Sequence, residues 1–298
     1  MEGGLATELL ARCTFPPPGT PVVCAVSGGA DSLCLLVLAV EAGCVATAVH
    51  VDHGLREGSE DEARVVEAAA RRLGASFRAE RVTVEPGPNL EARARAARHA
   101  VLPPGALLGH TADDQAETVL LNLLRGAGLD GLAGMRRDGR RPLLDLRRWE
   151  TRALCDELGL EVVEDPSNRD PSLRRNRVRN ELLPLLADIA GRDVVPIISR
   201  QADVVRAAAE LLDELAAAVD PTDAGALDAA PPVLGAVAVR NWLRGCSPDW
   251  HPPSLATVER VLMVASGEAT GTEVGGGWRV DRSGQRLRLH RASTGVER

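Results

Sequence analysis

The chain has no lysine and no tyrosine, and only 2% of its 298 residues are aromatic. All 35 basic residues are therefore arginines. Without lysine, the chain cannot form a Schiff base and cannot use the lysine of a Walker A loop. Any phosphate that it binds must be held by backbone N–H groups, hydroxyl groups, arginines or a metal ion.

Other absences narrow the class of protein. No apolar run approaches the roughly 18 residues of a membrane span, and the first residues lack the pattern of a secretory signal. None of the six cysteines forms a Cys-x-x-Cys pair, so a zinc site or disulfide framework is not indicated. We expect a cytoplasmic protein with no membrane contact. The net charge of −7 argues against a general nucleic-acid coat protein but leaves room for a local basic surface.

Short β-type runs alternate with helical patterns in the first half of the chain. The predicted strands are 21–26, 45–51, 76–84 and 107–109, and the predicted helices are 31–42, 60–73, 89–99 and 113–124. This alternation predicts an α/β fold with a doubly wound parallel sheet. A long helical pattern ends at 220, and a Gly-rich, hairpin-like tail follows at 273–289. We therefore predict a catalytic domain over 1–193, a connecting helix over 194–220, and a smaller C-terminal domain over 221–298.

Polar residues follow three of the predicted strands. Ser27, the pair Asp52 and His53, and His110 each stand directly after a strand. In a parallel sheet these positions share one edge, where ligands bind. The sequence thus predicts a binding site at this edge.

The segment Ser-Gly-Gly-Ala-Asp-Ser at 27–32 joins the first strand to a helix. Its glycines allow an anion to approach the backbone, and the helix start offers free N–H donors. Asp31 suits this site if Mg²⁺ joins it to phosphates. The alternative is a capped turn in which Asp31 and Ser32 satisfy helix N–H groups.

Two further segments have both a structural and a functional interpretation. His110, Asp114 and Glu117 open a helix and could hold a cationic amine or a magnesium ion, although acids in a first turn also favour the helix dipole. The arginines at 174, 175, 177 and 179 could contact nucleic-acid phosphates or form a solvated loop and helix start. Arg95 and Arg98 share a helical face, which is typical of a solvated surface.

The segment 27–32 resembles the pyrophosphate loop of the N-type ATP pyrophosphatases. The chain as a whole resembles the tRNA(Ile)-lysidine synthetases, densely over about 20–190 and more loosely toward the C-terminus. The shared motifs are Ser-Gly-Gly-x-Asp-Ser at 27–32, His-Gly-Leu-Arg at 53–56, Asn-x-Glu with Ala-Arg-x-x-Arg at 89–98, Asp-Asp-Gln-x-Glu-Thr at 113–118, Arg-Gly-x-Gly-x-x-Gly-Leu-x-Gly-Met at 125–135, Arg-Pro-Leu-Leu at 141–144, and Glu-Asp-x-Ser-Asn with Arg-Asn-x-x-Arg at 164–179. The chain departs from the family pattern at Thr111, where a second histidine is usual, and at His99, where tyrosine is usual.

The resemblance implies an enzyme that uses ATP and Mg²⁺ to attach free L-lysine to the anticodon wobble cytidine of a tRNA(Ile) with a CAU anticodon. It implies that Asp31, Asp114 and Glu117 are catalytic and that Asp31 positions the metal. The implied ATP-binding residues are Ala25, Ser27, Gly28, Gly29, Asp31, Ser32, Val51 and His53. The implied lysine-binding residues are His110, Asp114 and Glu117, and the implied tRNA-binding residues are Arg95, Arg98, Arg174, Arg175, Arg177 and Arg179. The sequence leaves open whether the chain forms a homodimer.

Three alternatives remain at this point. A tRNA 2-thiolase would share the loop but normally needs suitably spaced cysteines, and an amidotransferase-type synthetase would lack the motifs at 164–179. A non-catalytic tRNA-binding module belongs to a different class, and an intact loop with Asp31 argues against it.

Overall fold

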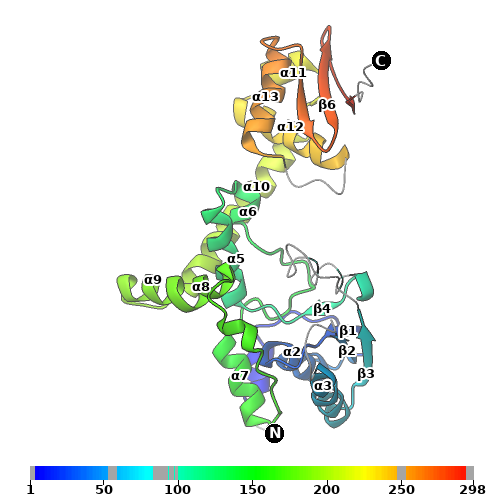
Figure 1. Ribbon diagram of the computed structural model, residues 1–298, viewed down its shortest axis with the longest axis vertical. Coiled ribbons are helices and arrows are strands. Elements are labelled where there is room, and N and C mark those ends of the chain that lie inside the picture. Colours follow the sequence, from blue (N-terminus) through cyan, green and yellow to red (C-terminus); the bar gives the residue numbers. More distant parts are fainter. Residues whose placement is uncertain are drawn as a thin grey trace. The chain divides into compact units, whose positions relative to one another are not determined.

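In the computed structural model (Figure 1), the structure describes residues 4–52, 59–82, 93, 97, 100–246 and 253–292. The chain divides into two compact units. The first comprises 1–126 and 134–202, and the second comprises 127–133 and 203–298. The division falls within helix α10 (Val195–Ala216), so the helix expected to connect the domains contributes residues to both units.

The first unit is built on a parallel four-stranded sheet of order β3-β2-β1-β4. Its strands are β1 (Pro21–Ala25), β2 (Val45–Asp52), β3 (Ser76–Arg81) and β4 (Leu107–Leu108). The chain winds outward from β1 to β3 and then returns to place β4 on the other side of β1. This reversal makes the gap between β1 and β4 a topological switch point, where ligands bind in such sheets.

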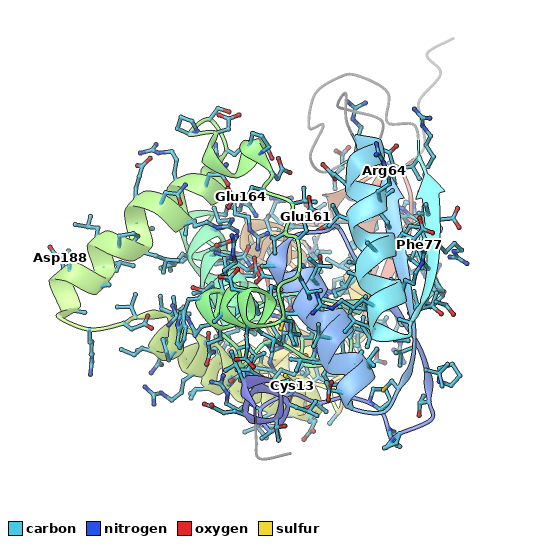
Figure 2. All side chains as sticks on the ribbon, turned by 90° about the horizontal axis from the view of Figure 1, so that it is seen from below. Cys13, Arg64, Phe77, Glu161, Glu164 and Asp188 are labelled. Carbon is cyan, nitrogen blue, oxygen red and sulfur yellow. The ribbon has the colours of Figure 1, made fainter. Side chains whose placement is uncertain are left out.

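Helices cover the sheet of the first unit. They are α1 (Leu5–Leu10), α2 (Ala30–Glu41), α3 (Ser59–Leu73), α5 (Ala112–Leu124), α7 (Arg148–Glu157), α8 (Arg174–Arg177) and α9 (Leu183–Ala190). Helix α2 is buried on most sides because it packs among the sheet, α1 and α7, which explains its nearly uninterrupted apolar sequence. Figure 2 shows α3 beside β3, with Arg64 on the helix and Phe77 on the strand.

A second core fixes α5 against the segment that follows α7. Ala116 and Leu120, one helical turn apart, pack with Val178 and Leu183. The chain there runs from α8 through a π-helical turn (Val178–Leu182) into α9. The π turn stands just before Pro184, which has no N–H for a regular helical bond. This packing sets the polar face of α5 against the arginines of α8 and the π turn.

The second unit has its own core and a three-stranded antiparallel sheet of order β5-β6-β7. Its elements are α6 (Leu129–Leu132), α11 (Ala224–Ala229), α12 (Pro232–Cys246), α13 (Leu255–Ser266), β5 (Gly271–Gly275), β6 (Trp278–Ser283) and β7 (Arg286–Arg291). The segment 273–289, which was predicted to be hairpin-like, is therefore part of a three-stranded sheet. Among the described residues, no helix combines the length and apolar content that a bilayer span requires.

The predicted fold class is confirmed: the chain is an α/β protein with a parallel sheet and a C-terminal sheet unit. The expected helix over 89–99 lies mostly outside the described residues. Helix α7 (Arg148–Glu157) lies in a part of the chain where the sequence analysis predicted no helix.

Candidate active site

The loop after β1 is held in shape by its two serines. The backbone N–H of Ser27 donates to Ser32 Oγ at 3.1 Å, and Ser32 Oγ donates to the carbonyl of Gly29 at 2.8 Å. Gly28 adopts a φ of 88°, a conformation that side chains rarely adopt. The loop thereby leads into the N-terminus of α2, where unpaired N–H groups can meet an anion.

The segment after β4 lies directly against this loop. A Cβ atom added at Gly109 would stand 2.7 Å from the carbonyl oxygen of Asp31 and 3.1 Å from Ser32 Cα. Only glycine permits so close an approach. The starts of α2 and α5 are therefore neighbours at the switch point. The sequence analysis predicted this, because both helices follow strands that end at the same edge of the sheet.

The first turn of α5 is capped by Asp114. The backbone N–H and the hydroxyl of Thr111 donate to Asp114 Oδ2 at 2.9 and 3.1 Å. Asp113 instead forms a two-point ion pair with Arg147 and accepts from the backbone N–H of Arg148 at 2.8 Å. Asp113 thus fixes the start of α7, while Oδ1 of Asp114 faces the site.

Arg148 links the loop at 27–32 to helix α5 through ion pairs. Its Nε lies 3.4 Å from Asp31 Oδ2, its Nη2 lies 3.0 Å from Asp114 Oδ1, and its Nη1 lies 3.1 Å from Glu117 Oε1. Thr151, one turn further along α7, donates a hydrogen bond to Asp31. One guanidinium thus contacts all three acids that the sequence named as catalytic.

Arg175 and Arg179 complete the cluster from the opposite side. Arg175 Nε donates to Glu117 Oε2 at 2.7 Å, and Arg179 Nε donates to Glu117 Oε1 at 2.7 Å. Arg175 also reaches Asp114 Oδ1 at 3.2 Å. The side chain of Glu117 is fully buried, and its charge is compensated by three arginines.

The electrostatics of Asp31 and Asp114 differ. Burial, together with the charge of Asp114, raises the pKa of Asp31 to about 6, against the opposing effects of Arg148 and Thr151. Burial also disfavours the ionised form of Asp114, but Arg148, Arg175 and the Thr111 N–H outweigh it and lower its pKa to about 2. Asp114 is therefore ionised at neutral pH, while Asp31 is ionised less readily.

The structure places most of the predicted site residues at this edge of the sheet. Ala25 is the last residue of β1, and Val51 is the next-to-last residue of β2. The loop residues 27–32 follow β1, and His110 precedes α5. The ATP-site prediction at His53 and the tRNA-site predictions at Arg95 and Arg98 lie outside the described residues.

The four arginines predicted to contact tRNA fall into two pairs. Arg175 and Arg179 point into the acidic cluster. Arg174 and Arg177 are exposed, and Arg177 pairs with Glu181 at 2.8 Å. The two pairs therefore meet different environments although they alternate in sequence.

Sequence reasoning missed Arg148 and Thr151. A helix start is usually recognised by Ser, Thr, Asp or Asn at the N-cap. Here Arg147 occupies that position, and Glu150 supplies the returning bond to the Arg147 N–H at 2.7 Å. The acid at the third helical position was the available signal.

Comparison with known proteins agrees with this geometry. A PP-loop domain family matches residues 7–186. The tRNA(Ile)-lysidine synthase of Nocardia farcinica is 44% identical over 259 residues, covering 82% of this chain and 80% of that protein. That of Rhodococcus erythropolis is 40% identical, covering 87% and 85%.

Among solved structures, the U34-tRNA thiolase NcsA from Methanococcus maripaludis superposes with a TM-score of 0.54 at 16% identity, over 68% of this chain and 78% of that chain. This likeness concerns the fold. The sequence relatives and the PP-loop match together identify the family: the chain belongs to the tRNA(Ile)-lysidine synthases, which are PP-loop proteins.

Proposed function

We propose that the chain uses ATP to attach free L-lysine to C2 of the wobble cytidine of a tRNA(Ile) with a CAU anticodon. The family supports the overall reaction. The observation that carries the assignment of substrates is the mixed cluster beside the loop, where Asp114 and Glu117 meet Arg148, Arg175 and Arg179.

This cluster suits a free amino acid. Lysine carries ammonium groups, which call for carboxylates, and a carboxylate, which calls for a guanidinium. Asp114 and Glu117 supply the first kind of group, and the three arginines supply the second. His110 precedes α5 beside them and completes the proposed lysine site.

The reaction has two steps. The C2 carbonyl oxygen of the cytidine attacks the α-phosphorus of ATP, the bond between the α-phosphorus and the bridging oxygen breaks, and pyrophosphate leaves. An amine of lysine then attacks C2, the C2–O bond breaks, AMP leaves, and the amine loses a proton. The N–H groups at the start of α2 and the hydroxyls of Ser27 and Ser32 hold the phosphates.

The site also fits Mg²⁺. Asp31 presents one partly exposed carboxylate at the loop, and among the described residues no group of three or more His, Cys, Asp or Glu has the arrangement of a metal site. A single carboxylate plus phosphate oxygens is a normal environment for this ion. Bound there, Mg²⁺ would neutralise charge on the phosphates. Asp31 would hold it, and Arg148 and Thr151 would orient Asp31.

The wobble base lies in a loop, so presenting it to the site requires little unpairing. Arg174 and Arg177 are exposed and would contact the tRNA backbone, together with the arginines at 95 and 98. Arg175 and Arg179, predicted for the same role, would serve the tRNA only after leaving their present partners.

The test is incorporation of labelled lysine into tRNA(Ile) with ATP, with AMP and pyrophosphate measured in parallel. We expect one AMP and one pyrophosphate for each lysine attached, and no label when ATP is omitted. If pyrophosphate is released and no lysine enters the tRNA, the lysidine proposal fails and another adenylation reaction stands. An Asp188→Asn variant, changed at an exposed acid of α9 (Figure 2), serves as a matched control for variants of the site acids.

A further inference from the structure

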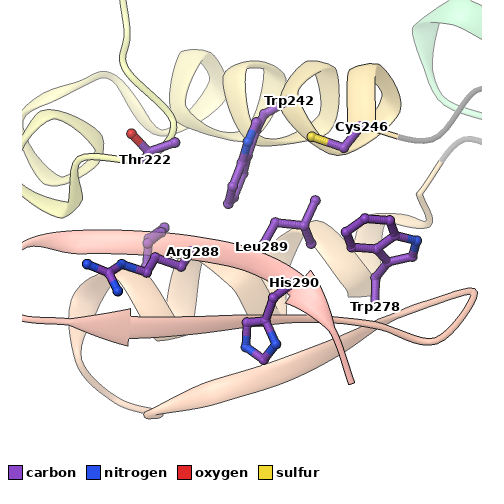
Figure 3. Close-up of a pocket in the computed structure, with 8 residues that line it drawn as sticks. Thr222, Trp242, Cys246, Trp278, Arg288, Leu289 and His290 are labelled. Carbon is purple, nitrogen blue, oxygen red and sulfur yellow. The ribbon is translucent and has the colours of Figure 1, made fainter. Parts of the chain in front are cut away.

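A groove in the second unit combines two tryptophans with basic side chains. It has a volume of about 710 Å³ and is lined by Thr222, Trp242, Cys246, Trp278, Leu287, Arg288, Leu289 and His290. Two of the four tryptophans of the chain line it. Figure 3 shows α12 on one side, with Trp242 pointing toward Leu289 of the edge strand β7.

Two indoles line the groove. Trp242 and Trp278 pack against the core of the second unit but remain partly exposed. The guanidinium of Arg291 lies 5.1 Å from the ring centroid of Trp278, in the geometry of a cation–π contact. A half-buried indole beside a guanidinium is a surface on which a planar base can stack.

The surroundings of the groove are basic within an acidic chain. The β5–β7 segment, 271–291, carries five arginines and two acids, whereas the whole chain has a net charge of −7. Arg288 lines the groove, is exposed, and has no ion pair within the described part of the chain. Arg279 and Arg286 pair with Asp281 and Asp220, whereas the exposed Arg288 can meet a phosphate.

We propose that the groove between α12 and β7 binds an unpaired nucleotide of the tRNA, with its base against Trp278 or Trp242 and its phosphate near Arg288. This inference rests on the proposed function, which makes a tRNA the substrate. Single-stranded RNA is bound by stacking on aromatic side chains and by arginine contacts to the backbone, and a duplex offers no free base face. The groove favours RNA over an acidic peptide because a peptide would use the arginine but offers no planar base to stack on an indole.

Cys246 reports on the groove without any mutation. It is the exposed cysteine at the groove, whereas burial raises the pKa of Cys13, Cys24 and Cys155 to about 12 and also raises that of Cys34 and Cys44. Iodoacetamide will therefore react first at Cys246. We expect saturating tRNA or a uridine dodecamer to slow this reaction by about fivefold or more, because a bound nucleotide covers the thiol.

Duplex RNA is the matched control. Equal protection by duplex would mean that the backbone alone binds and would overturn the stacking proposal. No protection by a tRNA that the chain demonstrably binds would overturn the groove itself, while lysine transfer to that tRNA would leave the proposed function standing. If instead lysine transfer fails but the dodecamer protects Cys246, the groove stands and the proposed function falls.

Variants give a second readout. Trp278→Leu should weaken tRNA binding by about tenfold, and Trp278→Phe, which keeps a ring, should recover most of that loss. Arg288→Gln should weaken binding and reduce its salt dependence, whereas Arg71→Gln, at an exposed arginine of α3, should do neither.

Tryptophan fluorescence gives a third readout. Because the chain has no tyrosine, a Trp149→Phe and Trp250→Phe variant emits from the two groove indoles alone. Its emission should fall when the dodecamer binds, and an unchanged emission at saturation would contradict stacking.

Discussion

Arg148 at the start of α7 is bonded to Glu117 of α5, with Nη1 3.1 Å from Oε1, while its Nε faces Asp31 in the first turn of α2. The Arg148 side chain thus links the loop at 27–32 to Glu117, the buried acid of the proposed lysine site. The arginine neutralises acids that the substrates would otherwise meet. We therefore expect binding of ATP and lysine to be coupled through Arg148.

Replacing Arg148 by Gln should destabilise the fold by about 2 kcal/mol, because it leaves buried carboxylates with fewer partners. Glu117→Gln should destabilise it for the converse reason. The double variant should lose less than the sum of the single losses, since each change removes the partner that the other leaves unpaired. Urea denaturation of the four proteins measures this, and strictly additive losses would show that the two side chains are not coupled.

Asp114→Asn should raise the KM for lysine by about tenfold, because a neutral amide attracts an ammonium group less than a carboxylate does. The amide oxygen can still accept from Thr111, so the start of α5 should remain intact. The KM for ATP should change little. Initial rates at varied lysine and varied ATP measure both constants, with Asp188→Asn as the control, and a loss confined to ATP would assign Asp114 to the nucleotide instead.

The raised pKa of Asp31 gives a pH-dependent effect on stability. Because its pKa in the folded chain is about 6 against an ordinary 3.8, the protonated form favours folding. That contribution is present below about 3.8 and is lost as the pH rises through 6. Asp31→Asn should therefore be more stable than the parent chain by about 2 kcal/mol at pH 7.5, with the difference shrinking toward pH 5. Denaturation across this range tests it, and a difference independent of pH would rule out the titration of Asp31 as the cause.

Gly109→Ala tests the contact between the two helix starts. The added Cβ would lie 2.7 Å from the Asp31 carbonyl, so α2 and the β4–α5 connection must separate. We expect a loss of about 1–3 kcal/mol and weaker ATP binding. Gly4→Ala is the control, because a Cβ there has no neighbour closer than 3.7 Å. Unchanged ATP binding in a folded Gly109→Ala variant would show that the two helix starts need not touch.

Substitutions of Arg174 and Arg175 should differ in their effects on tRNA binding and on stability. Arg174→Gln should weaken tRNA binding and lower its salt dependence without changing stability, since Arg174 is exposed. Arg175→Gln should instead lower stability, because it removes a bond to the buried Glu117. Filter binding at several salt concentrations and thermal melts measure the two effects. If Arg175→Gln weakened tRNA binding without lowering stability, Arg175 would be assigned to tRNA binding instead.

Much of the catalytic unit follows from its sequence. The strand and helix periods placed Ser27, Asp31, His110 and Asp114 at one edge of a sheet, and the order of the strands brings them together. The role of Arg148 could not be read in this way. Its helix begins at an arginine rather than at a usual capping residue, and its partners lie on helices distant in sequence. Spacing also made the arginines at 174–179 look equivalent, because only the packing of Val178 against α5 decides which of them face Glu117.

The most direct test of the central claim is the chemical position of the lysine after reaction. Labelled lysine should remain bound after mild alkali and should co-purify with a single modified cytidine after digestion of the tRNA to nucleosides, because a bond from nitrogen to C2 survives alkali. Asp31→Asn should give no such product. Label that alkali releases as free lysine would reveal an ester at the 3′ end of the tRNA, and that result would contradict the account.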